Sequence, residues 1–348
     1  MNRLVTFRLH VAIIISILVS LSAVIFYVFV GESVLEGQID FQFYADSLTY
    51  EELYYSNYFD NIWKTVGFGG NYFGPILILK SFNGSRVCVL LFNCAIFLIS
   101  IKLIVSSSNI RPRILLFLLI LNPITFFSLV SVNKEIISLL VCALVIKWIY
   151  SRWFGYVFFA FFISFMVRWQ LSIFVLFLVF SMSNLNFIKK LRFLYILISL
   201  IFISIVYYKL GHLFENVNAV AQAGALTNQG SGIYSLFNRL QAQGFYFLVF
   251  VPKTLHAIFG LISNIFSIFN PTNIYNDVII TINAVVSFSV FCFLFLRNRF
   301  RLRNDLVFAS ILYCMIFSLS PIYSPRYFYP VFIFLAIILA SRSLKQKG

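Results

Sequence analysis

Apolar stretches long enough to cross a bilayer follow one another along the whole chain, and short polar segments separate them. A hydrocarbon core about 30 Å thick is crossed by about 20 helical residues. Because lipid offers no partner for backbone N–H and C=O groups, such runs are predicted to be helices. The pattern predicts an all-α, polytopic transmembrane helix bundle of about ten spans. The expected spans are 9–30, 86–106, 114–132, 135–150, 153–168, 170–185, 191–210, 277–296, 305–321 and 326–341.

The composition agrees with this pattern and excludes an ordinary soluble domain. The chain is 61% hydrophobic and 11% charged, whereas about a quarter of the residues of a soluble domain are charged. No stretch is polar enough for a separate soluble domain, so residues 1–348 are expected to form one integral membrane domain. The first span follows Arg3 and Arg8 without a small-residue cleavage site, which predicts a retained helix.

The cysteines and histidines predict no metal site, no disulfide frame and no cofactor. The five cysteines lie inside apolar runs without CxxC spacing, which is typical of small core residues. The three histidines are scattered along the chain and form no metal-ligand pattern.

The net charge of +15 reflects topology, and it does not indicate a nucleic-acid partner. The basic residues fall in short clusters between apolar runs, which is the positive-inside pattern of cytoplasmic loops. These clusters are Arg111 with Arg113, Lys147 with Arg152, 189–192, 297–303 and 342–347. They predict a multi-pass protein whose N- and C-termini are both cytoplasmic.

Two long regions, residues 31–85 and 211–276, then fall on the outer face. Seven of the eleven acidic residues lie in the first region, between residues 32 and 60. Residues 245–269 are apolar enough to span, but a span there would move the 297–303 cluster outside. We therefore expect an interfacial or re-entrant course for this segment, which Pro252 interrupts. Long connections often carry function, so the outer face is the predicted working face.

The stretch "SLVSVNKEIISLL" places a polar triplet at the outer end of two expected spans. Asn133 is suited to cap a helix, and the helix dipole favours Glu135 in the first turn. A cation is unfavourable at that position, so capping alone leaves Lys134 unexplained. Lys134 therefore indicates an anionic ligand such as a phosphate.

The stretch "FYADSLTYEELYYSNYFD" in the first outer region combines acids with tyrosines. Asp46 can cap a helix on which Tyr50 and Tyr54 share one face. Tyrosines that anchor an interfacial helix at headgroup level would explain the rings, although they leave the density of acids unexplained.

Further cations are expected on the same outer face: Arg168, Arg239, Lys253 and Arg326, with His256 nearby in sequence. Each one alone fits a side chain that snorkels to the interface. Together with Lys134 they form a set suited to a lipid-linked phosphate or diphosphate, which arginine binds bidentately and lysine as a point charge.

Four short motifs recur in an order known from another group of proteins. They are Asp46-Ser-Leu-Thr-Tyr50, Asn122-Pro123 followed by Lys134-Glu135, Pro252-Lys253, and Arg326-Tyr327-Phe-Tyr-Pro330. This layout resembles polytopic bacterial enzymes that act on polyprenyl-linked sugars. The chain is similar to Wzy-type O-antigen or repeat-unit polymerases, and related in layout to the C-type membrane glycosyltransferases.

The resemblance implies a glycosyltransferase of the bacterial inner membrane whose active face is periplasmic. Its expected partners are a polyprenyl-diphosphate-linked oligosaccharide, membrane lipid and other polysaccharide-assembly membrane proteins. Asp46 would then be the leading candidate for the general base, with Asp60 and Glu135 behind it. The donor phosphate would be bound by Lys134, Arg168, Arg239, Lys253 and Arg326, and the residues in contact with sugar would be Tyr50, Tyr54, His256 and Tyr327. Many C-type enzymes carry a paired acidic motif and often a metal, whereas Ser47 follows Asp46 here, so no metal is expected.

Three alternatives remain open from the sequence. A C-type transferase would add a single sugar from a polyprenyl-phosphate donor. A flippase for lipid-linked oligosaccharide would need polar residues along a path from both sides, and many transporters show two similar halves, which this sequence lacks. A structural or assembly protein would need no clustered outer-face cations.

Overall fold

The computed structural model describes residues 3–31, 45–56, 72–107, 110–182, 190–209, 231–272 and 274–341. Within these ranges every regular element is helical, and the only extended pairing is an isolated antiparallel bridge between Ile110 and Ser341. The elements are α1 (Arg3–Phe26), η1 (Tyr27–Gly31), α3 (Ala45–Tyr55), α5 (Phe73–Ser81), α6 (Arg86–Ser107), α7 (Pro112–Leu121), α8 (Pro123–Val130), α9 (Glu135–Ser151), α10 (Phe154–Val167), α11 (Trp169–Ser181), α13 (Arg192–Lys209), α15 (Ser231–Ala242), α16 (Tyr246–Phe259), η3 (Gly260–Ile268), η4 (Tyr275–Ile280), α17 (Thr281–Leu296), α18 (Asp305–Phe317), η5 (Pro325–Phe328) and α19 (Tyr329–Ala340).

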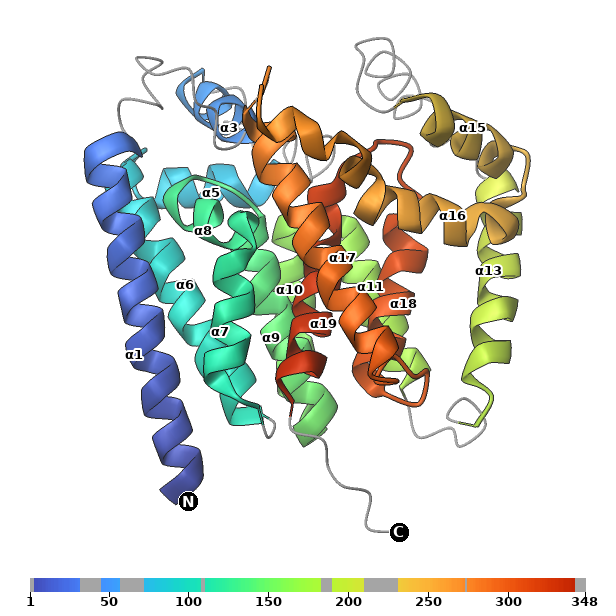
Figure 1. The fold of residues 1–348 in the computed structure, drawn as a ribbon, viewed down its shortest axis with the longest axis horizontal. Coiled ribbons are helices and arrows are strands. Elements are labelled where there is room, and N and C mark those ends of the chain that lie inside the picture. The colour runs from blue at the N-terminus through green and yellow to red at the C-terminus, as the bar shows by residue number, and fades with distance from the viewer. Residues whose placement is uncertain are drawn as a thin grey trace.

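The long helices stand side by side and define two ends of the molecule (Figure 1). Helix α1 begins and α19 finishes at one end, which we call the basic end because Arg111, Arg297 and Arg299 gather there. Helices α3, α5 and α15 lie at the opposite end, which we call the α3 end. The arginines Arg111, Arg297 and Arg299 of the basic clusters and the acidic helix α3 therefore lie at opposite ends.

Helix α9 forms the centre of the bundle. It packs against α6, α10 and α19, and every residue from Glu135 to Ile146 is buried. Helix α19 is buried in the same way from Tyr329 to Ile338. A helix that is apolar around its whole circumference is typical of the interior of a large bundle. These two helices fix the positions of Glu135 and Tyr329, with which they begin at the α3 end.

Five helices of the described part are long and apolar enough to cross a membrane, or up to six if a bent pair counts as one. They are Thr6–Val30, Arg86–Ser107, Arg192–Lys209, Tyr246–Ile268 and Tyr275–Leu296. Shorter apolar helices, among them α10, α11 and α18, pack between them. The all-helical, membrane-type fold is thus confirmed, while length and composition support fewer spans than the ten expected.

The span expected over 114–132 is bent, and it consists of the two helices α7 and α8. Helices α7 and α8 meet at Asn122 with a bend of 77°. Pro123 begins α8, and a proline inside a continuous helix would remove one hydrogen bond and clash with the preceding turn. The Asn122 side chain caps the new helix by accepting the Ile124 N–H at 3.0 Å, and it donates to Asn283 Oδ1 at 2.7 Å.

Residues 245–269, which the charge pattern predicts to stay on the outer face, form α16, and this helix continues into the 3-10 helix η3. Together α16 and η3 (Tyr246–Ile268, 23 residues) have the length and hydropathy expected of a membrane span. Figure 1 shows α16 lying across the α3 end, transverse to α13 and α17. Pro252 lies inside α16 and does not end it.

Candidate functional site

The site begins with helix α3, which is anchored on the bundle by two polar contacts. The Ser47 hydroxyl donates to the Val132 carbonyl at 2.8 Å, just before the polar triplet. Glu51 forms an ion pair with Arg86 at 2.7 Å, at the start of α6. These contacts hold the first turn of α3, and with it Asp46, against the α8–α9 connection.

The polar triplet folds as a capped helix start, as the sequence predicts. The Asn133 side chain accepts the N–H groups of Glu135 at 2.9 Å and Ile136 at 3.2 Å. The Glu135 carboxylate in turn accepts the Lys134 N–H at 3.1 Å. Asn133 and Glu135 thus satisfy backbone donors of the first turn of α9, and the Lys134 side chain takes no part in this cap.

The Lys134 side chain is buried, with 5% of its surface exposed. Its ammonium lies over the rings of Tyr50 at 5.2 Å and Tyr72 at 5.4 Å. Among the described residues no carboxylate lies within ion-pair distance of it. Burial, assisted by the positive charge of Arg168, lowers the pKa of Lys134 from 10.5 to about 7. The charges of Asp46 and Glu135 oppose this lowering, but within the described ranges each of these carboxylates is ion-paired with an arginine and not with Lys134.

Arg168 forms the second cationic element, in the short turn between α10 and α11. Its guanidinium pairs with Glu135 at 3.2 Å, and both side chains are buried. The same guanidinium stacks over the Tyr327 ring at 3.9 Å. Glu135 therefore orients Arg168 and also contributes to the cap of α9.

Arg326 brings the last helix into the site by pairing with Asp46 at 2.5 Å. Tyr50 donates to the same carboxylate oxygen at 3.2 Å, and Arg326 donates to the Tyr275 hydroxyl at 3.5 Å. Burial alone would raise the pKa of Asp46, but the charges of Arg326, Lys134 and Arg168 outweigh it and lower this pKa. Asp46 is the more exposed partner, with 36% of its side chain accessible.

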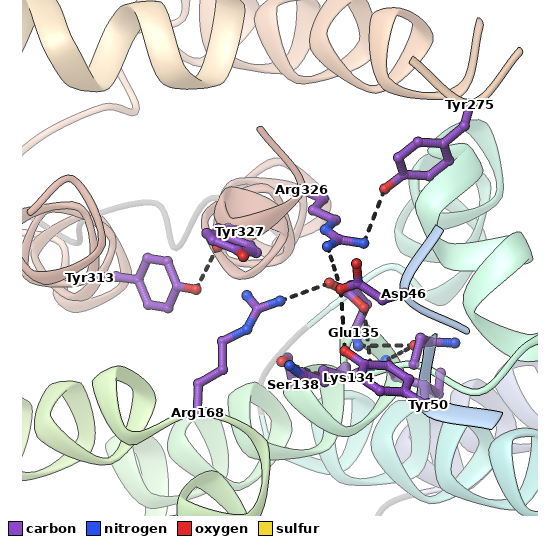
Figure 2. A network of polar contacts seen from close by, with 12 residues as sticks. Asp46, Tyr50, Lys134, Glu135, Ser138, Arg168, Tyr275, Tyr313, Arg326 and Tyr327 are labelled. Carbon is purple, nitrogen blue, oxygen red and sulfur yellow. Dashed lines mark hydrogen bonds and ion pairs between the residues drawn. The ribbon is translucent and has the colours of Figure 1, made fainter. Parts of the chain in front are cut away.

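Figure 2 shows these groups facing one another, and we call Asp46, Lys134, Glu135, Arg168 and Arg326 the cationic cluster. Three cations oppose two carboxylates when Lys134 is protonated, so the cluster then carries an excess of one positive charge. Both carboxylates are paired with arginine. The arrangement can accept an anion that approaches Lys134 and displaces Asp46 from Arg326.

An apolar groove of about 410 Å³ begins beside this cluster. Arg168 and Tyr327 line the end next to the cluster, and Ile173, Phe202 and Phe317 contribute the apolar wall from α11, α13 and α18. A groove of this size lies in the range of small-molecule sites, about 300–1,000 Å³. A ligand with a charged head and a long apolar tail fits this combination.

Several predicted site residues lie elsewhere. Lys253 is buried within α16, where its ammonium donates to Gln241 at 2.6 Å and to the Ser320 carbonyl at 3.2 Å. His256 packs against the Tyr323 ring at 5.4 Å. Arg239 is exposed on α15. The contacts of Lys253 and His256 lie outside the cationic cluster.

Two predicted site residues remain, Tyr54 and Asp60. Tyr54 contacts the Tyr55 ring at 5.0 Å and lies beside Gly84, where the chain has a positive φ of 72°. Asp60 lies outside the described residues. The structure therefore brings Asp46, Tyr50 and Tyr327 together with Lys134, Glu135, Arg168 and Arg326.

The structure adds tyrosines that sequence reasoning missed. Tyr72 is one of the two tyrosines whose rings the Lys134 ammonium lies over, and the Tyr275 hydroxyl accepts a hydrogen bond from Arg326. Tyr313 donates to the Tyr327 carbonyl at 2.6 Å and so fixes the residue under Arg168 (Figure 2). In a chain with 19 tyrosines nothing in the local sequence marks these three.

No group of three or more histidine, cysteine, aspartate or glutamate side chains suited to a metal occurs in the described ranges. Comparison of the chain with protein-family models, with curated proteins and with solved structures found no match in any of the three. The geometry of the cationic cluster and the groove is therefore the basis on which a function can be inferred.

Proposed function

We propose that this protein is a membrane glycosyltransferase that uses a polyprenyl-diphosphate-linked donor. In this proposal it crosses the bacterial inner membrane about ten times, with both termini cytoplasmic and the α3 end periplasmic. It joins oligosaccharide repeat units of a polysaccharide such as O-antigen.

The observation that carries the proposal is the environment of Lys134. A buried ammonium normally pairs with a carboxylate, because taking a charge out of water is costly. Here it faces two tyrosine rings, with two arginines in the same cluster. A diphosphate supplies the missing negative charge, and pre-placed cations stabilise the charge that develops when it leaves.

The groove beside Arg168 supports a lipid-linked donor over a soluble one. Its wall is formed largely by aliphatic and aromatic side chains, including Ile173 and Phe202, which are themselves exposed on the surface of the bundle. An isoprenoid chain can lie there while its diphosphate remains at the cluster. A nucleotide-sugar would leave this apolar surface unused.

The same geometry suggests how the base becomes available. At rest Asp46 is paired with Arg326, and its lowered pKa makes it a weak base. A bound diphosphate competes for Arg326 and thereby releases Asp46 toward the acceptor. The acceptor hydroxyl oxygen then attacks the anomeric carbon of the donor sugar, and its proton passes to the Asp46 carboxylate. The carbon–oxygen bond to the diphosphate breaks, and its electron pair remains on the departing diphosphate oxygen.

The distribution of buried charge favours an enzyme over a flippase. The cationic cluster lies at the α3 end, and the buried asparagines Asn93, Asn122 and Asn283 are occupied by hydrogen bonds within the protein. A transporter would need polar groups along a path that reaches both ends.

The test is the banding pattern of the surface polysaccharide after deletion of the gene in its own host. Complementation would use Asp46→Asn, Lys134→Ala and Arg326→Ala, with Lys209→Ala as the control. Lys209 is an exposed cation at the last residue of α13 and lies outside the cluster. We expect the deletion and the three cluster variants to leave single repeat units, and Lys209→Ala to restore the ladder.

Other outcomes would contradict the proposal in different ways. An unchanged ladder in the deletion strain would remove the polymerase and favour a transferase that adds a side-branch sugar. Loss of all surface glycan, with lipid-linked units trapped inside, would favour a flippase. Full activity in all three cluster variants, with each protein present in the membrane, would refute the site while leaving the fold unaffected.

A further inference from the structure

A second hollow lies at the basic end, between the ends of α7, α17 and α19. Its volume is about 330 Å³. Three arginines line it, Arg111, Arg297 and Arg299, together with the apolar side chains of Ile114, Phe293 and Leu339. Because α19 begins at Tyr329 near the cationic cluster and ends at this hollow, the two sites lie at opposite ends of the bundle (Figure 1).

The three arginines are held around the hollow by the fold. Arg299 donates through Nη1 to the Ser341 carbonyl at 3.1 Å and to the Leu339 carbonyl at 3.5 Å, at the end of α19. The Arg111 N–H donates to the Ala340 carbonyl at 3.0 Å, beside the bridge between Ile110 and Ser341. The Arg297 guanidinium stacks over the Phe293 ring at 5.0 Å. Since each guanidinium carries five N–H donors, these contacts leave donors for a ligand.

No acidic side chain lines this hollow in the described part of the chain. In the sequence, the residues that precede Ile110 and follow Ser341, 108–109 and 342–348, contain no aspartate or glutamate. Asp305, at the start of α18, pairs instead with Arg192 and with Arg152, the latter at 3.7 Å. Three positive charges therefore meet at one concave surface without an acid among its lining residues, and their repulsion falls when an anion binds.

We propose that this hollow binds the headgroup of an anionic phospholipid. Arginine binds phosphate oxygens through paired N–H donors, and basic pockets between transmembrane helices at the cytoplasmic side are suited to lipid phosphates. The apolar side chains beside the arginines provide contacts for the first carbons of an acyl chain. This site is independent of the glycosyl-transfer proposal, which concerns the other end of the bundle.

The test is a lipid titration of the purified full-length protein in detergent, with bound lipid counted by native mass spectrometry. The probes are phosphatidylglycerol, phosphatidylcholine and inorganic phosphate. The double variant Arg111→Gln/Arg297→Gln is compared with Arg301→Gln. Arg301 is an exposed arginine of the same connection, its Nε donates to Asn298 at 3.1 Å, and it does not line the hollow. Arg299 is left intact because it caps the end of α19.

We expect one phosphatidylglycerol to bind more tightly than phosphatidylcholine, and the double variant to weaken it about thirtyfold. Arg301→Gln should bind like the wild type. Equal binding of the two lipids, or equal loss in Arg301→Gln, would show that general surface charge is responsible and would overturn the proposal. Displacement of phosphatidylglycerol by inorganic phosphate at similar concentration would assign the hollow to free phosphate and would overturn the lipid. Circular dichroism of each variant confirms that it is folded.

Discussion

Replacing Lys134 by methionine removes the unbalanced charge of the cationic cluster while retaining most of the apolar side chain. Burial is the main cause that lowers the pKa of Lys134 from 10.5 to about 7. At 1.36 kcal/mol per pKa unit, this difference corresponds to about 5 kcal/mol against the charged form in the folded protein. Lys134→Met should therefore be at least as stable as the wild type at neutral pH, because it no longer buries an ammonium.

The stability of the wild type relative to Lys134→Met should increase with pH. The folded pKa of Lys134 lies below the unfolded value of 10.5, so the unfolded chain binds more protons between about pH 7 and 10.5. The penalty is complete below about pH 7 and decreases as the pH rises toward 10.5. The melting temperature of the wild type should thus rise relative to that of Lys134→Met between about pH 6.5 and about pH 9.5.

The same substitution should abolish function while the fold persists. Loss of one pre-placed donor to a developing oxyanion costs about 10²–10³ in kcat. The rate of repeat-unit transfer by the purified protein measures this loss, and Lys209→Met is the matched control. Full turnover in Lys134→Met would refute the phosphate-binding role. A lower melting temperature than the wild type at neutral pH would refute the conclusion that this ammonium destabilises the empty protein.

Three further substitutions test the surrounding structure. Glu135→Gln should lower the free energy of unfolding by about 3–5 kcal/mol, measured by thermal or denaturant unfolding, because it leaves Arg168 buried without its counter-charge; an unchanged melting temperature would contradict this. Ile173→Trp should fill the apolar groove and raise KM for a long-chain polyprenyl donor but not for a short-chain analogue, and an equal effect on both would remove the groove from the binding site. Asn283→Ala should lower the stability by about 1–3 kcal/mol in the same unfolding assay, because the amide of Asn122 at the α7–α8 bend loses its buried acceptor; a change below about 0.5 kcal/mol would refute that contribution.

Where the determinants are local, sequence reasoning reproduced the structure closely. The span expected at 86–106 corresponds to α6 at Arg86–Ser107, because the length of an apolar run fixes the helix that it can form. Capping by Asn133 was equally predictable, since a side chain two residues away provides the acceptor. The break at Asn122 was missed because a long apolar run dominated the signal of Pro123, although that proline carries the physical reason for the bend.

The candidate site was only partly predictable. Short motifs pointed to Asp46, Lys134 and Arg326, but nothing local distinguished these residues from Lys253 or Arg239. The structure separates them by their contacts: Lys253 is bonded to Gln241 and Ser320, whereas Lys134 lies over the rings of Tyr50 and Tyr72 within the cationic cluster. Glu135 changes in the same way from a candidate base to the partner of Arg168.

The sequence by itself determined the membrane-type helical fold and the separation of the basic clusters from the polar triplet, because hydropathy and charge act within single segments. Tertiary structure alone decided that Asp46 meets Arg326, 280 residues further along the chain, and that Tyr72 and Tyr50 enclose Lys134. It also decided that an apolar groove begins beside Arg168. Such contacts depend on how distant helices pack, and pairing across that distance leaves no periodic signal in one sequence.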